Sequence, residues 1–237
     1  MGQSFFQFKQ FQVVQDRCAM KVCTDSCVMG AIIPVVNAQR ILDIGTGTGL
    51  LALMLAQRAA ANAHIDALEI DEVAAEQATE NISESPWKER ITVHKIALQK
   101  FVASAPYDLI VSNPPFYENH LKRGGQAQNI AMHSEQLSLQ ELAENIARLL
   151  SADGRAVVLL PPYQAENFQQ NMAQQSLFLV ANTFLFDREG GKMIRHISTY
   201  ARQQTNEFLL EKLYIRNPDN EYTEAFIQLL KPYYLHL

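Results

Sequence analysis

The chain has 237 residues, of which 48% are apolar and 19% charged, a composition that excludes an intrinsically disordered protein. Its formal net charge of −5 excludes a strongly basic chain, so charge alone does not indicate a nucleic-acid-binding surface. The sequence has no apolar run near the roughly 20 residues of a membrane helix and no N-terminal signal peptide, which predicts a cytoplasmic protein with no membrane partner.

From residue 40 onward, short apolar segments alternate with segments of helical composition. We predict strands over residues 40–44, 64–70, 91–96 and 107–112, helices over 50–58 and 71–84, and a short helical stretch after residue 96. Ser138 and Glu141 form the capping box of a helix that extends to about Leu150, and Gly154 ends this helical region. Further strands are predicted over 155–160, 177–186, 193–202 and 207–215, and helices over 164–175 and 222–230. This alternation predicts an α/β fold with a mainly parallel sheet and helices on both faces.

Three glycines alternate with other residues between the first predicted strand and the first predicted helix. The segment reads Asp43-Ile44-Gly45-Thr46-Gly47-Thr48-Gly49. Glycine permits positive φ angles and lets the backbone approach a ligand closely at a helix N-terminus. The dinucleotide fingerprint needs its third glycine one residue later, so this spacing disfavours NAD and FAD. The carboxylate of Asp43 would suit the sulfonium and amino group of S-adenosylmethionine.

Glu69 and Ile70 stand at the end of the second predicted strand. A carboxylate at this place can accept hydrogen bonds from both hydroxyls of a ribose, and an apolar neighbour can pack on an adenine. The alternative is that Glu69 is an ordinary solvated carboxylate. Combined with the glycine turn, the pair predicts a ligand that contains an adenosyl group.

The second informative motif is Asn113-Pro114-Pro115-Phe116, directly after the fourth predicted strand. The two prolines prevent the chain from continuing as a strand or a helix. The side-chain oxygen of Asn113 and the carbonyl of Pro114 could then accept both hydrogens of a flat NH2 group. Such acceptors stabilise the positive charge that develops when the nitrogen attacks a methyl group, while Phe116 stacks on the base. The alternative is a structural Pro-Pro turn.

With these two motifs, the sequence resembles the class I S-adenosylmethionine-dependent methyltransferases that carry an N-P-P-F/Y motif and methylate planar nitrogens. More narrowly, it resembles the bacterial enzymes that methylate N6 of adenine 37, just 3′ of the anticodon, in tRNA1(Val). The matching stretches are residues 8–11, 16–22, 24–25, 43–58, 85–87, 113–116, 215–216 and 218–219. The resemblance implies a Rossmann-like, seven-stranded sheet, with residues 1–39 covering the cofactor site and residues 40–237 forming the methyltransferase domain.

The resemblance also implies roles for individual residues. S-adenosylmethionine would contact Asp43, Gly45, Thr46, Gly47, Gly49, Glu69, Ile70, Ala97, Leu98 and Asn113, with Lys21, Thr24 and Asp25 in the covering segment. The target base would contact Asn113, Pro114 and Phe116. Relatives carry an aspartate where this chain has Ala97, so we expect weaker cofactor binding or contacts through the backbone and Leu98.

The expected partner is the anticodon stem-loop of a tRNA, bound by a monomer. We predict RNA contacts by Arg17, Lys21, Tyr117, Lys122, Arg123, Arg188, Lys192 and Arg195. Residues 117–135 form a long connection, which predicts a lid over the substrate. The phenylalanines at positions 5, 6, 8 and 11 could stack on bases, but packing of the N-terminal arm on the domain explains them better.

No metal is expected. Cys18, Cys23 and Cys27 lack the spacing of an iron–sulfur motif and are predicted to be buried thiols. The six histidines show no metal-ligand spacing. Three alternative functions stay open at this point: ribosomal-RNA guanine-N2 methylation, protein glutamine-N5 methylation, and a cofactor-binding module without catalysis.

Overall fold

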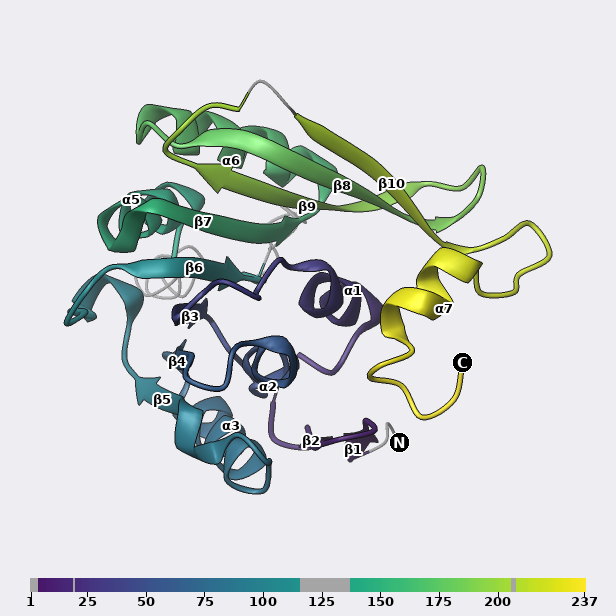
Figure 1. Cartoon of the computed structure of the whole chain (residues 1–237), viewed down its shortest axis with the longest axis horizontal. Helices are drawn as coiled ribbons and strands as arrows, with labels where there is room; N and C mark the ends of the chain where they lie inside the picture. Colours follow the sequence, from purple (N-terminus) through teal and green to yellow (C-terminus); the bar gives the residue numbers. More distant parts are fainter. Residues whose placement is uncertain (1–3, 19, 116–136, 206–207) are drawn as a thin grey trace, which may run out of the picture.

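The computed structural model describes residues 4–18, 20–115, 137–205 and 208–237, which fold around one large sheet (Figure 1). The eight strands of this sheet are, in spatial order, β10 (Leu209–Arg216), β8 (Phe178–Arg188), β9 (Met193–Ala201), β7 (Leu150–Leu160), β6 (Tyr107–Ser112), β3 (Arg40–Ile44), β4 (His64–Glu69) and β5 (Ile91–Lys95). All described pairings are parallel except those of β9 with β7 and β8. The predicted mainly parallel α/β sheet is confirmed.

The sheet has eight strands rather than the seven that the resemblance implied. The additional edge strand is β10, which pairs in parallel with β8 from Leu209 to Arg216. Because the chain reverses direction after β9, a further strand can lie beside β8 and parallel to it. The strand predicted over residues 207–215 is therefore real, and it extends the sheet at the edge opposite β5.

Helices cover both faces of the sheet, as predicted. Figure 1 shows α5 and α6 on one face and α1, α2 and α7 on the other. The helices are α1 (Thr24–Ile32), α2 (Leu50–Arg58), α3 (Glu72–Ser83), α5 (Leu139–Leu149), α6 (Pro162–Gln174) and α7 (Glu224–Leu230), with short 3-10 turns at Lys88–Arg90 and Leu98–Lys100. Among the residues described, no helix has both the length and the apolar character needed to cross a bilayer.

Each central strand contributes to two apolar cores, because successive side chains of a strand point to opposite faces. Ile41 lies in the core with residues of α1, α2 and α7. Leu42, the next residue, lies in the core with residues of α5 and α6. Burial on both faces explains why these strands read as continuous apolar runs in the sequence.

The largest boundary difference lies between α5 and β7. The sequence predicted a helix to Leu150 and a strand from Arg155, whereas α5 ends at Leu149 and β7 begins at once at Leu150. The register of β7 against β6 shifts in this stretch. A Cβ on Gly154 would lie 2.8 Å from the carbonyl oxygen of Tyr107. Gly154 therefore permits close strand approach at an irregularity rather than ending the helix.

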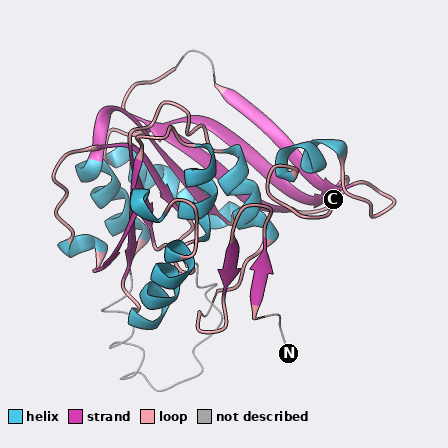
Figure 2. Ribbon diagram, turned by 60° about the horizontal axis from the view of Figure 1, so that its bottom comes forward, coloured by secondary structure: helices cyan, strands magenta, loops and turns pink. Residues whose placement is uncertain are grey.

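The N-terminal residues form a separate hairpin of β1 (Phe5–Gln7) and β2 (Gln12–Val14), visible beside the large sheet in Figure 2. Phe8 and Phe11 are buried and stack on each other with ring centroids 4.5 Å apart. Phe8 also contacts Tyr234, and Phe11 contacts Trp87. These contacts agree with the predicted packing of the N-terminal arm and leave neither ring available to a base.

Candidate functional site

The segments of the predicted site meet at the carboxyl edge of the sheet. Strand β3 pairs with β4 on one side and with β6 on the other. The chain builds β4 and β5 on one side of β3 before it crosses to β6, so the strand order reverses between β3 and β6. Open α/β sheets bind ligands at such a switch point. The glycine turn after β3, Glu69 at the end of β4 and Asn113 after β6 therefore lie along one edge.

The glycine turn has the conformation that its sequence predicts. Gly45, Gly47 and Gly49 have φ angles of 72°, 56° and 83°. The amides of Gly45 and Thr46 both donate to the carbonyl of Leu68 at 2.9 Å, which fixes the turn to β4. A Cβ on Gly45 or Gly47 would meet no described atom within 4 Å, so the backbone there borders open space. The turn thus combines a rigid backbone with room for a ligand.

The carboxylate of Glu69 is held by backbone amides from two segments. Its Oε2 accepts from the amide of Gly47 at 2.9 Å, and its Oε1 accepts from the amides of Ile70 and Asp71 at 2.9 and 3.0 Å. A carboxylate has about four lone-pair sites, so capacity for a further hydrogen bond remains. Ile70 beside it is 58% exposed, which leaves an apolar surface next to an acceptor.

Ala97 and Leu98 occupy the corresponding place after β5. The amide of Ile96 donates to the carbonyl of Glu69 at 3.0 Å, which keeps this segment beside the end of β4. Ala97 is half-buried and Leu98 is buried. At this position the site therefore offers a ligand only backbone and apolar groups, whereas the resemblance implied an aspartate in relatives.

Asp43 is fully buried beneath the glycine turn. Its Oδ2 accepts from the hydroxyl of Thr46 at 2.6 Å, whereas its Oδ1 makes no hydrogen bond within the described residues. Burial raises the pKa of this carboxyl from 3.8 to about 7, and hydrogen bonding by Thr46 and by the backbone of Ala52 only partly opposes that shift. A buried carboxylate with one unpartnered oxygen would be stabilised by a cationic ligand.

Asn113 presents the second unpartnered acceptor. Its side chain is buried, and its Nδ2 donates to the hydroxyl of Ser26 at 2.7 Å. Its Oδ1 makes no hydrogen bond within the described residues. Leaving a buried acceptor unpaired costs about 1–3 kcal/mol, so such an atom needs an explanation. Ser112, the preceding residue, donates its hydroxyl to the carbonyl of Ile44 at 2.9 Å, which places Asn113 beside the glycine turn.

The N-terminal segment reaches this site from two directions. The side chain of Asn81 on α3 bonds the amide and carbonyl of Val14 and also donates to the carbonyl of Thr48 in the glycine turn, at 2.8–2.9 Å. Helix α1 carries Ser26, whose hydroxyl oxygen accepts the hydrogen bond from Asn113. Ser26 is absent from the sequence-based site, because a single serine without a motif carries no signal.

The remaining predicted residues of this segment have other contacts. Lys21 is exposed and donates to the carbonyl of Gln15, and Thr24 is the exposed first residue of α1. Asp25 is buried, and its Oδ2 lies 2.7 Å from Nε of Arg195 on β9. The structure thus brings Asp25 close to the site through its neighbour Ser26.

Apart from Lys21 and Arg195, the predicted RNA contacts divide into three groups. Arg188 at the end of β8 and Lys192 in the turn before β9 are both exposed. Because β8 is parallel to β6, that turn lies at the same edge of the sheet as Asn113. Arg17 forms an ion pair with Glu80 on α3. Phe116, Tyr117, Lys122, Arg123 and the predicted lid over residues 117–135 lie outside the described residues.

The cysteines are free thiols, and two of the three are buried as predicted: Cys18 and Cys27, with Cys23 half-buried. Burial raises the pKa of the Cys27 thiol to about 12, which makes it unreactive at neutral pH. Within the described residues, no group of His, Cys, Asp and Glu side chains could hold a metal ion.

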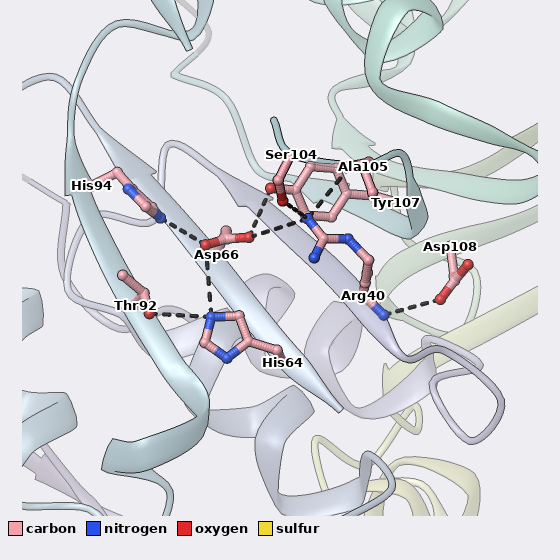
Figure 3. A network of polar contacts seen from close by, with 9 residues as sticks. All are labelled: Arg40, His64, Asp66, Thr92, His94, Ser104, Ala105, Tyr107 and Asp108. Carbon is pink, nitrogen blue, oxygen red and sulfur yellow. Dashed lines mark hydrogen bonds and ion pairs between the residues drawn. The ribbon is translucent and has the colours of Figure 1, made fainter. Parts of the chain in front are cut away.

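A polar network that the sequence did not predict surrounds Asp66 on β4 (Figure 3). Its carboxylate contacts His94 Nε2 at 2.6 Å and accepts from the Tyr107 hydroxyl at 2.7 Å, with Arg40 and His64 within 4.0 Å. Arg40, His64 and Tyr107 are the first residues of their strands. The network therefore lies toward the amino ends of the strands, away from the glycine turn, and we interpret it as structural.

Comparison with known proteins identifies the family of this chain. Residues 18–141 match the family model described as "Methyltransferase small domain". A "tRNA1(Val) (adenine(37)-N6)-methyltransferase" of Cytophaga hutchinsonii is 44% identical over the full length of both chains. A protein of the same name from Dyadobacter fermentans is 43% identical over 97% of each chain.

Among solved structures, a predicted O-methyltransferase of Agrobacterium tumefaciens has a TM-score of 0.65 at 15% identity and covers 88% of this chain and 96% of its own. That likeness shows the class I methyltransferase fold. The family model and the full-length relatives identify the family and the group within it. The chain belongs to the methyltransferase small-domain family and, within it, to the group of tRNA1(Val) (adenine(37)-N6)-methyltransferases.

Proposed function

We propose that this protein transfers a methyl group from S-adenosylmethionine to N6 of adenine 37 in the anticodon loop of tRNA1(Val). The observation that carries the proposal is the buried, unpartnered Oδ1 of Asn113 beside the glycine turn. The names of full-length relatives supply the substrate. Because the proposed substrate is a tRNA, we also propose a cytoplasmic location.

The residues at the carboxyl edge fit S-adenosylmethionine. The open space at Gly45 and Gly47 admits a ligand against the backbone, and the unpartnered Oδ1 of Asp43 favours a cation. Glu69 is oriented by backbone amides to accept a ribose hydroxyl, and the exposed Ile70 can pack on the adenine. When bound, S-adenosylmethionine supplies the electrophilic methyl group on its sulfonium.

In this proposal Asn113 and Pro114 act by accepting hydrogen bonds. The amino group of adenine is a weak nucleophile because its lone pair is delocalised into the ring. Acceptors on both of its hydrogens favour a tetrahedral nitrogen and stabilise the positive charge that develops there. The Pro-Pro sequence fixes the backbone after β6, so the acceptors need no reorganisation during the reaction.

The chemistry also suits a base in a loop. Adenine 37 lies in a single-stranded loop, so its transfer into the site costs less than extraction from a duplex. Arg188 and Lys192, exposed at the same edge of the sheet, are proposed to contact RNA phosphates. Phe116 is proposed to stack on the base.

Two other methylation reactions would use the same acceptors, since guanine N2 and glutamine Nε2 are also flat NH2 groups. We favour adenine because the full-length relatives named above carry that activity in their names. A module that binds cofactor without catalysis is disfavoured, because it would gain nothing from the unpartnered amide oxygen of Asn113.

The test is methyl transfer from labelled S-adenosylmethionine to unmodified tRNA1(Val), followed by nucleoside analysis. We expect N6-methyladenosine, and we expect Asn113→Ala to lower kcat by about 10²- to 10³-fold while the protein still binds cofactor. The matched control is Asn182→Ala, which removes another buried asparagine, on β8.

The outcomes separate the candidate functions. Recovery of N2-methylguanosine would replace adenine by guanine as the substrate. Absence of transfer to any RNA or protein by the parent, with cofactor binding intact, would support a binding module. An Asn182→Ala variant as inactive as Asn113→Ala would show that lost stability, not lost acceptors, explains the result.

A further inference from the structure

The orientation of the Asn113 amide decides whether this site can act on an amine. Rotation of the amide by 180° exchanges Oδ1 and Nδ2, which have nearly the same shape. With Nδ2 toward the base, two N–H donors would face each other and no acceptor would be offered. The fold must therefore hold the amide with Oδ1 free, and this requirement is separate from the presence of asparagine itself.

Two side chains of the N-terminal segment contact Nδ2 of Asn113. The hydroxyl oxygen of Ser26 lies 2.7 Å away, and the thioether sulfur of Met20 lies 3.8 Å away. A thioether can only accept, so Met20 opposes the rotated amide. A serine hydroxyl can either donate or accept. Its one hydrogen can be used by Cys23, whose Sγ lies 3.0 Å from Ser26 Oγ, which leaves a lone pair for Asn113.

Ser26 is itself held through its neighbour Asp25. Oδ1 of Asp25 accepts from the amide of Ser26 at 2.9 Å, and Oδ2 of Asp25 forms an ion pair with Arg195 at 2.7 Å. Asp25 and Ser26 are both buried. Helix α1 is also pressed against α2, where a Cβ on Gly30 would lie 2.7 Å from Sδ of Met54. The helix thus ties the serine to strand β9 and to the core.

We propose that Ser26 is a positioning residue that holds the Asn113 amide with its Oδ1 toward the acceptor amine. Its effect on catalysis rests on the proposed function, whereas the amide orientation is a property of the free protein. Arg195 would then support this arrangement through Asp25, in addition to any contact with RNA.

The kinetic test compares Ser26→Ala with Ser26→Thr, which keeps the hydroxyl. Without this hydroxyl, Asn113 loses the hydrogen bond that fixes Nδ2 toward α1, so the amide can also populate the rotated orientation. A preference of about 1.4 kcal/mol for that orientation lowers the competent fraction about tenfold. We expect Ser26→Ala to lower kcat about tenfold without changing the KM for either substrate, and Ser26→Thr to recover activity. Ser26→Ala should add nothing in an Asn113→Ala background.

The matched control is Ser198→Ala. Ser198 is a buried serine whose hydroxyl donates to the side chain of Asn182, so the same kind of contact is removed elsewhere in the sheet. We expect its kcat to equal that of the parent. Equal losses in the two serine variants, or additive losses in the double variant, would overturn the proposal.

A second measurement does not depend on any substrate. In NMR spectra of the parent, we expect nuclear Overhauser contacts from the Nδ2 protons of Asn113 to the β protons of Ser26 and the methyl group of Met20. Their weakening in Ser26→Ala supports the proposal, and their absence from the parent refutes it. If the parent methylates no tRNA, the proposed function fails, and this measurement still decides whether Ser26 orients the amide.

Discussion

The buried carboxyl of Asp43 should make the stability of this protein fall as the pH rises. Its pKa is raised by burial from 3.8 to about 7. Between these values the native protein keeps a proton that the unfolded chain has released. The protonated Asp43 therefore contributes fully to the free energy of unfolding below about pH 4, and this contribution is lost as the pH rises through 7. With 1.36 kcal/mol for each pH unit, the total loss is at most about 4 kcal/mol.

The perturbation is Asp43→Asn, which replaces the carboxyl by a neutral group of the same shape. We expect this variant to lack the decline between pH 4 and 7 that Asp43 causes. It should be more stable than the parent at pH 8 and close to it at pH 4. The assay is urea unfolding at several pH values, followed by the fluorescence of the single tryptophan, Trp87. A difference between variant and parent that stays constant with pH would refute the reasoning.

The same variant should bind S-adenosylmethionine less tightly, because a cation favours the ionised carboxyl. In the parent the ligand must displace a proton from Asp43 below pH 7. Affinity should therefore increase with pH up to about that value, by at most about tenfold for each pH unit. Titration calorimetry in two buffers of different ionisation enthalpy would detect the released proton. Affinity in Asp43→Asn should be lower and nearly independent of pH over the same range.

Two further substitutions separate ligand binding from stability. Gly47→Ala places a side chain at a φ of 56° and in the open space at the turn. The strained φ should lower the free energy of unfolding by about 1–2 kcal/mol. Because the side chain occupies the space of the ligand, we expect the Kd of S-adenosylmethionine to rise by more than about tenfold. Gly190→Ala, at a φ of 71° in the turn after β8, is the control with similar strain and unchanged Kd; a Kd that rises equally in both would contradict the prediction. Tyr107→Phe removes a hydrogen bond to the carboxylate of Asp66 and should lower the free energy of unfolding in urea by about 1.5–3 kcal/mol. Its kcat should not change, and a large loss of kcat would show that the Asp66 network serves catalysis.

The parts of this fold that the sequence predicted are those specified by local patterns. Helix α2 and strand β6 begin and end at the predicted residues, Leu50–Arg58 and Tyr107–Ser112, because each is a continuous apolar segment next to a glycine or proline motif. The glycine turn and Asn113 were placed at strand ends for the same reason. Their adjacency required the order of the strands, which hydrophobic periodicity does not contain.

The parts that were not predicted depend on contacts between distant segments. Strands β1 and β2 have three residues each, too few for a periodic pattern. Helix α1 has no side-chain cap, so the usual start signal is missing. The contacts of Asp66 with His94, Tyr107 and Arg40 come from three other strands. Ser26 gains its role only because α1 folds over the end of β6.

Two buried groups at the carboxyl edge reduce the stability of the free protein, and each would be stabilised by one of the reactants of a methyl transfer. A carboxyl with a pKa near 7 at position 43 is costly without a cation beside it. An unpartnered amide oxygen at position 113 is costly without a donor. Beside these two groups, the backbone at Gly45 and Gly47 borders open space in which a ligand can lie against it. A cation, an amine donor and a ligand pressed against backbone are together what transfer of a methyl group from a sulfonium to an amino group requires. The buried carboxyl of Asp43 and the amide oxygen of Asn113 lie on different strands, yet the sulfonium donor and the amine acceptor of one reaction would stabilise both.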